Sequence, residues 1–520
     1  MSFSRKQYSG TCPGPAPVVA AEIAPDQGQF WRKNLGRSVM PLTLPRPASW
    51  WSGLAPEHCP GYSDASGKLH SLVIPNLKTC TRQEVLDYFD NTWTINELLF
   101  SSLIGEEPFY RPPYHNLRHP LIFYYVHPSV LYVNKLRLAG LVEGPVDAYF
   151  ERLFEIGVDE MSWDDMSKNE IQWPSIDACR EYKGRVYKLV RNIIETDPGL
   201  ADGHVPVDQD HPLWALFMGF EHERIHIETS SVLMRELPVH LLGTPAQWPA
   251  LAPTAGGQYP QNQFVDVASR SVKMGKPLDW PTFGWDNEYG RRSTTVGAFA
   301  AAKYLVSNGE YRQFVEDGGY SNRDNWTEIG WLWRSFRDVK CPTFWIPRQS
   351  EYLLRTCFEV VPMPWDWPVV VNYHEAQAYC LWSSRKSGTT TRLITESEHQ
   401  AMRARSDFDG ADINNLVAPQ PYNTNLRYGS ESPVDGNDQL FPDLFGNVWQ
   451  WSEDCFNPLP GFSVHPYYDD FSTPCFDGEH QMIMGGSYVS TGDEASSWAR
   501  FHFRPHFFQH AGIRLVKDPG

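Results

Sequence analysis

The chain has 520 residues, which is long enough for two or three domains that each bury a core. Its formal net charge of −17 would repel phosphate backbones and anionic membranes, which argues against nucleic acid and membrane partners. The nine cysteines include no CxxC pair, and no apolar run is long enough for a signal or membrane segment, so we expect a cytoplasmic protein.

The N-terminal half reads as an arm followed by helices. Residues 1–79 mix proline, glycine and tryptophan without periodicity, which is typical of an irregular arm. Residues 80–240 are expected to form a helical bundle, because they contain four stretches with helical periodicity. These stretches begin at a capping box formed by Thr81 and Glu84 and continue at 121–141, 175–196 and 212–237, with the last expected to start at Asp210.

The periodicity changes in the C-terminal half. A proline-rich linker is expected at 241–262. From residue 263 to 520, short β-like runs and dense turn signals surround two helical stretches, NGEYRQFVED and NYHEAQAYCLWSSRKSG. This half therefore fits an irregular α+β domain.

The stretch HERIHIE at 222–228 suggests a metal site. His222 and His226 are four residues apart on a predicted helix, so both imidazoles lie on one face and suit a single cation. In so short a pattern, the two histidines are about as often ordinary core or surface residues as metal ligands. The surrounding helix is strongly apolar, however, and buried imidazoles need polar partners, which favours a metal.

The third ligand distinguishes between classes of metal site. A zinc protease would use Glu223 as its base and would need a further ligand downstream, which IETSSVLMREL does not supply. His127 lies on another predicted helix, where Pro128 would loosen the backbone and turn the ring inward. Three neutral imidazoles suit a redox metal such as iron(II). Glu228 lies on a different helix face from His226, so we expect a supporting role for it.

Longer stretches carry a resemblance to known families. The N-terminal region resembles a DinB-like four-helix bundle, and the C-terminal half resembles the formylglycine-generating-enzyme fold, which is C-type-lectin-like. The combination is similar to the iron-dependent sulfoxide synthases of ergothioneine and ovothiol biosynthesis, which join cysteine sulfur to a histidine imidazole with O₂. The stretches that carry the resemblance include FGWDNEYG (283–290), YLVSNGEYRQFV (304–315), RLITESEHQAMRAR (392–405), LFGNVWQWSED (444–454) and GIRLV (512–516).

Within that group, the ovothiol branch is the more similar one. FYRPPYHNLRHPLIFYYVHP, VDEMSWDDMSKNE and YDDFSTPCFDG resemble 5-histidylcysteine sulfoxide synthase, which implies L-cysteine, L-histidine and O₂ as substrates. The resemblance places Fe(2+) on His127, His222 and His226. Ergothioneine enzymes usually carry a glutamine where this chain has Ile225, and an Asn-Trp-Asp run where it has FHFRPHFFQHAG (501–512). An ergothioneine-type or selenoneine-type synthase acting on trimethylhistidine is the alternative.

The resemblance also bears on partners and on competing functions. Ovothiol enzymes often continue into a methyltransferase domain that this chain lacks, so a separate methyltransferase and a C–S lyase are expected downstream. Formylglycine generation is disfavoured, because no cysteine pair follows GIRLV. A non-catalytic ligand-binding protein of the same fold is a further alternative, against which the three histidines argue. A zinc hydrolase comes last.

Candidate catalytic and substrate-binding residues follow from the same resemblance. Such synthases place a tyrosine beside the iron in the stretch that here reads HPYYDDFSTPCF, which implies Tyr468, or Tyr467, as a proton or hydrogen-atom donor. In isolation either would be an ordinary loop aromatic. The remaining candidates carry charges that suit an amino-acid substrate, although each is equally compatible with an ion pair or a solvated loop: Arg500, Arg504, Asp164 and Asp165.

Two further groups of histidines share the four-residue spacing. His502, His506 and His510 surround Pro505, which argues against a helix and favours pocket lining over a second metal site. His115 and His119 lie beside three prolines and are discounted for the same reason.

Overall fold

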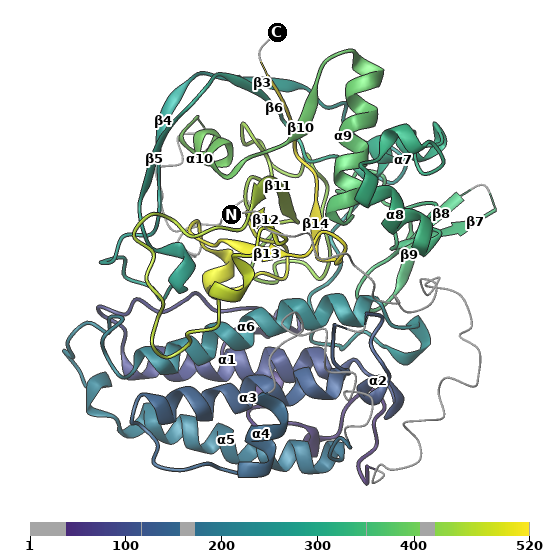
Figure 1. The fold of residues 1–520 in the computed structure, drawn as a ribbon. Coiled ribbons are helices and arrows are strands. Elements are labelled where there is room, and N and C mark those ends of the chain that lie inside the picture. The colour runs from purple at the N-terminus through teal and green to yellow at the C-terminus, as the bar shows by residue number, and fades with distance from the viewer. Residues whose placement is uncertain (1–37, 116, 156–171, 350, 406–421, 519–520) are drawn as a thin grey trace.

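The computed structural model has a helical N-terminal part packed against a C-terminal part of sheets and helices (Figure 1). This order agrees with the expected helical bundle followed by an α+β domain. The helices of the described chain are all too short or too polar to cross a membrane. The residues that the structure describes are 38–115, 117–155, 172–349, 351–405 and 422–518.

Four long helices form the N-terminal bundle, and α3 packs along α6. Aromatic side chains pack between these helices. The Phe89 ring, for example, stacks on Tyr187 and lies edge-on to Tyr132. The helices of this part are α1 (Arg82–Ser101), α2 (Glu107–Tyr110), α3 (Leu121–Leu138), α4 (Ala148–Glu155), α5 (Ile176–Thr196) and α6 (Trp214–Arg235).

Local sequence explains where these helices begin. The capping box expected at α1 is present: the Thr81 side chain accepts a hydrogen bond from the backbone N–H of Glu84, and the Glu84 carboxylate accepts one from the backbone N–H of Thr81. Helix α3 stays helical across Pro128, where a loosening was expected. Fourteen of its 18 residues are buried, and this packing outweighs the hydrogen bond that proline removes.

Helix α6 starts later than the sequence suggested. It begins at Trp214 rather than near Asp210. Side chains just before the helix form hydrogen bonds with nearby backbone N–H groups. The Asp208 carboxylate accepts one from Asp210 N–H at 3.2 Å, and His211 Nδ1 accepts one from Leu213 N–H at 3.1 Å. Such side-chain to backbone bonds favour turns over helix.

The C-terminal part contains four sheets within its described residues, and their strand orders are β13-β12-β11-β14, β10-β15-β6-β3, β7-β8-β9 and β4-β5. Its strands are β3 (Phe264–Val267), β4 (Arg270–Met274), β5 (Arg292–Val296), β6 (Phe299–Ala302), β7 (Trp345–Arg348), β8 (Glu351–Arg355), β9 (Val360–Pro362), β10 (Thr391–Leu393), β11 (Trp449–Cys455), β12 (Gln481–Met484), β13 (Phe501–Phe503), β14 (Ala511–Gly512) and β15 (Leu515–Lys517). Its helices are α7 (Asn308–Glu316), α8 (Glu328–Arg337), α9 (Tyr373–Ser387) and α10 (Glu396–Arg405). A short hairpin of β1 (Tyr62–Ser63) and β2 (Lys68–Leu69) precedes the bundle.

Helix α6 joins the two parts. It lies on the side of the bundle that faces strands β11–β13 (Figure 1). Its Glu228 carboxylate accepts hydrogen bonds from Trp449 Nε1 at 2.7 Å and Ser487 Oγ at 2.6 Å, and its Arg235 forms a fully buried ion pair with Glu431 at 2.6 Å. The helix that carries the HERIHIE stretch is therefore fixed by buried polar contacts from the C-terminal part.

Candidate metal centre

Three histidines from two helices meet inside the bundle. His127 projects from α3, and His222 and His226 project from successive turns of α6. One nitrogen from each ring lies within 4.8 Å of the other two, and the ring centroids are 4.4–5.0 Å apart. The side chains are 2–4% exposed, so the group is closed to bulk water.

The protonation of these rings suits a cation. His127 Nδ1 donates to the Phe154 carbonyl at 2.6 Å, which leaves Nε2 as the lone-pair nitrogen. The Nε2 atoms of His222 and His226 face each other at 3.1 Å. Burial lowers the pKa of His127 to about 4, against the raising effect of its carbonyl bond, and burial lowers the pKa of the other two well below the usual value. Neutral imidazoles with converging lone pairs are the donor set of a metal site.

An aromatic column holds the His127 ring in place. Phe123, one turn earlier on α3, stacks on His127 with ring centroids 4.8 Å apart, and it also stacks on His119 at 4.2 Å. Tyr124 lies 5.9 Å from the His226 ring. The stacking fixes the ring plane, and the Phe154 carbonyl fixes its rotation, so the ligand is preorganised.

The two glutamates of the stretch point away from the three histidines. Glu223 is buried in the bundle and accepts a hydrogen bond from Tyr132 at 2.9 Å, and burial raises its pKa to about 7. A zinc protease base would instead face the metal-bound water. Glu228 binds Trp449 and Ser487 of the C-terminal part. It therefore has the supporting place that its helix face indicated.

A tyrosine of the C-terminal part faces the three histidines. The Tyr468 ring lies 6.0 Å from the His222 ring, and Lys135 Nζ lies 3.8 Å from the centre of the Tyr468 ring. Burial and the nearby Asp470 raise the pKa of Tyr468, so the phenol keeps its proton at neutral pH. Tyr467 contacts His465 instead, at 5.0 Å.

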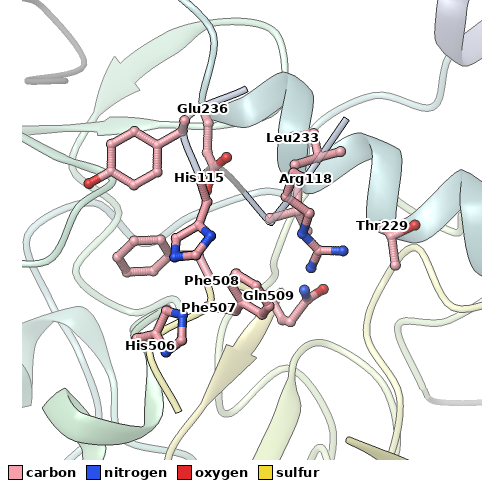
Figure 2. Close-up of a pocket in the computed structure, with 11 residues that line it drawn as sticks. His115, Arg118, Thr229, Leu233, Glu236, His506, Phe507, Phe508 and Gln509 are labelled. Carbon is pink, nitrogen blue, oxygen red and sulfur yellow. The ribbon is translucent and has the colours of Figure 1, made fainter. Parts of the chain in front are cut away.

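A small pocket lies beside the C-terminal end of α6, and Figure 2 shows the residues that line it. Thr229 and Glu236 line it from the same helix face as His226, and Arg118 lies close enough to lower the pKa of His226. Burial raises the pKa of Glu236 to about 7, an effect that Arg118 opposes. His115 and His506 complete one wall, with ring centroids 4.9 Å apart. The pocket thus combines a guanidinium group with a buried carboxyl group whose pKa is raised.

The remaining sequence candidates lie elsewhere or outside the description. Arg500 is buried in an ion pair with Glu396 at 2.6 Å, and Arg504 pairs with Glu479 at 2.8 Å. Both arginines thus have the structural ion pairs that the sequence left open as an alternative. Asp164 and Asp165 lie outside the described residues.

Sequence reasoning missed several residues that surround the histidines. Lys135 follows His127 by two helical turns on α3, and this i+8 spacing was a usable signal. Tyr124 precedes His127 by three residues and offered the same kind of signal. Arg118 comes from the irregular segment before α3, where no periodicity predicts its direction.

Comparisons with known proteins agree with this architecture. The profile of the family described as the sulfatase-modifying factor enzyme 1-like domain (FGE-sulfatase) matches residues 250–519, and the chain belongs to this family. The match covers the C-terminal part, from the expected linker onward.

Curated relatives extend the similarity into the helical part. Ergothioneine biosynthesis protein 1 of Neurospora crassa is 23% identical, with 87% of this chain and 60% of that protein covered. The protein of the same name from Schizosaccharomyces pombe is 24% identical over 77% of this chain and 52% of its own length. Hercynine oxygenase of Mycobacterium tuberculosis is 31% identical over 45% of this chain and 56% of that protein. The chain thus spans between half and two thirds of the length of these relatives.

Proposed function

We propose that this member of the sulfatase-modifying factor enzyme 1-like family is an iron-dependent sulfoxide synthase. The reaction joins a thiol RSH to an imidazole C–H with O₂, giving the imidazolyl sulfoxide and one water. Two of the four electrons taken up by O₂ come from forming the C–S bond, and two come from oxidising sulfur. The buried group of three neutral histidines, with Tyr468 facing it, is the observation that carries the proposal.

His127, His222 and His226 fit iron(II), because three neutral nitrogen donors leave coordination positions for substrates. Iron(II) bound there would activate O₂ and lower the pKa of a thiol. The chain supplies the remaining functions. The Phe154 carbonyl orients His127, burial excludes water, and the Tyr468 phenol holds a proton close to the His222 ring, where it would serve as the proton donor. Lys135 keeps the phenol ring in place through its cation–π contact.

The pocket supports amino acids as the substrate class. Arg118 and Glu236 line one cavity, and when Glu236 is ionised their opposite charges complement the carboxylate and the ammonium group of a zwitterion. Its lining includes Thr229, which follows His226 by one helical turn on α6.

The relatives favour trimethylhistidine, or hercynine, as the imidazole substrate. Two of them are named for ergothioneine biosynthesis and one for hercynine, whereas the sequence analysis put L-histidine first. L-Histidine is the second candidate. Ile225 favours it, because an apolar side chain stands between the two α6 ligands where ergothioneine enzymes usually present an amide. L-Cysteine is the proposed thiol for both.

The test is reconstitution with iron(II) without air, followed by addition of air, L-cysteine and either trimethylhistidine or L-histidine, with mass detection of the coupled sulfoxide. The His222→Ala variant should lose product, and His240→Ala, an exposed histidine after α6, should keep it. Product from trimethylhistidine alone supports the ergothioneine-type assignment, and product from L-histidine alone supports the ovothiol-type one. No coupled product from the iron-loaded protein with either substrate would refute the synthase.

A further inference from the structure

A second group of metal-type ligands lies in the C-terminal part. Cys475, His480 and His502 each offer a ligand atom within 4.8 Å of the other two. They come from three separate places: the 3-10 turn Thr473–Cys475, the residue before β12, and β13. Antiparallel pairing of β12 with β13 sets His502 opposite Met482, so the backbone fixes two of the three positions.

Asp477 orients the His480 ring. Its carboxylate lies 3.0 Å from His480 Nδ1, and it also accepts the backbone N–H groups of Glu479 at 2.8 Å and His480 at 3.1 Å. This turn holds the carboxylate rigidly, and the carboxylate places the proton of His480 on Nδ1. Nε2 is then the nitrogen with the lone pair, which is the carboxylate–histidine–metal arrangement of protein metal sites.

Apolar side chains line part of the site, beside the Asp477 carboxylate and Arg504, which lie 3.8 Å apart. Cys475 packs with Phe456, Met482 and Met484, and the His502 ring stacks on Phe456 at 4.1 Å. A buried thiolate is stabilised by a neighbouring cation, and a metal ion held by Cys475 and the two imidazoles would be such a cation.

We propose that Cys475, His480 and His502 bind a divalent ion of the zinc class, separate from the three-histidine centre. One thiolate and two imidazoles suit a tetrahedral borderline-soft ion and leave a fourth position for water. This inference does not depend on the proposed synthase activity.

The position of the site indicates what it does. Cys475 follows Tyr468 by seven residues. Between them, Ser472 donates a hydrogen bond to Asp286 and accepts one from Asn287, both in the 3-10 turn Asp286–Glu288. Phe471 contacts the Tyr468 ring at 5.2 Å. A metal that joins Cys475 to β12 and β13 would tie this segment to the sheet and so fix the tyrosine that faces the three histidines. Tyr468 is thereby positioned from the C-terminal part, while the three histidines come from the bundle.

The test uses cobalt(II) with the full chain. Thiolate bound to cobalt(II) gives a near-ultraviolet charge-transfer band, which three histidines without a thiolate do not give. We expect the band in the unchanged protein and in His222→Ala, and its loss in Cys475→Ser and His502→Asn. Cys455→Ser is the matched control and should keep the charge-transfer band, because the Cys455 thiol instead donates a hydrogen bond to the Gly478 carbonyl at 3.6 Å.

Absence of the band, or its persistence in Cys475→Ser, would overturn the site and leave Cys475 as a packing residue. Retained cobalt binding at the three histidines of Cys475→Ser, seen as visible absorption, would show that the variant has folded.

The proposal that this metal fixes the segment around Tyr468 is tested by hydrogen exchange of residues 465–476. Zinc should slow this exchange in the unchanged protein and leave it unaltered in Cys475→Ser, and exchange that ignores zinc in the unchanged protein would overturn the role.

Discussion

Gly219 of α6 lies directly against the Tyr132 ring of α3. A Cβ atom added at Gly219 would lie 2.3 Å and 2.4 Å from two ring carbons of Tyr132. Carbon atoms normally stay roughly 3.5–4.0 Å apart, so α3 and α6 would have to separate by about 1 Å or the ring would have to move. The ring is fully buried and bound to Glu223, which leaves helix separation as the main response.

Gly219→Ala should therefore destabilise the protein and weaken its metal site. Overpacking at the upper end of its range costs about 3 kcal/mol, and replacing a helical glycine by alanine returns about 1 kcal/mol, for a net loss of roughly 2 kcal/mol in the free energy of unfolding. Iron(II) should also bind less tightly, because His127 moves with α3 while His222 and His226 stay on α6.

Denaturant unfolding and competition for iron(II) with a chelator measure the two effects. Gly184→Ala is the matched control, because its Cβ would meet only Ser52 Cβ at 3.8 Å, so it should keep iron affinity and gain up to about 1 kcal/mol. The reasoning is refuted if Gly219→Ala unfolds at the same denaturant concentration as Gly184→Ala and binds iron equally well.

Other consequences concern the tyrosine, the joint between the two parts and the response to pH. Tyr468→Phe should lower the rate of sulfoxide formation by roughly 10²–10⁴ with unchanged iron affinity, whereas Tyr467→Phe should have little effect in the same assay. Glu431→Gln leaves the Arg235 guanidinium buried without its counterion and should cost about 3–5 kcal/mol in denaturant unfolding. Burial lowers the pKa of His374 to about 4, so as pH falls from about 6.5 to 4 the unfolded chain takes up a proton that the folded chain refuses, and stability falls. Over that pH range the free energy of unfolding should fall less in His374→Asn than in the unchanged protein, by at most about 3 kcal/mol. An equal fall in both proteins would contradict the lowered pKa of His374.

Periodic and capping signals in the sequence predicted the bundle well. Thr81 and Glu84 form the expected cap, and the histidines of two separate helices meet as their faces indicated. Helix faces repeat every 3.6 residues, so residues on one face can be identified before the fold is known. The start of α6 was placed too early, because the side chains of Asp208 and His211 bind the backbone locally.

Side chains from irregular segments were harder to place. Arg118 reaches the pocket from the segment before α3, and the pairing of Arg500 with Glu396 joins residues 104 positions apart. No periodicity relates such residues, so only the folded chain shows which of them meet. The four-residue spacing of His502 and His506 was rightly given no helical meaning, yet His502 meets Cys475 and His480 through strand pairing.

The most direct test of the synthase is the origin of the sulfoxide oxygen. The iron-loaded protein would be supplied with L-cysteine, the imidazole substrate found by the coupling assay and ¹⁸O₂ in ordinary water, and the product would be weighed by mass spectrometry. We expect a coupled product that carries one ¹⁸O atom, because one oxygen goes to sulfur and the other leaves as water. A coupled product without ¹⁸O, or no iron-dependent product at all, would contradict it.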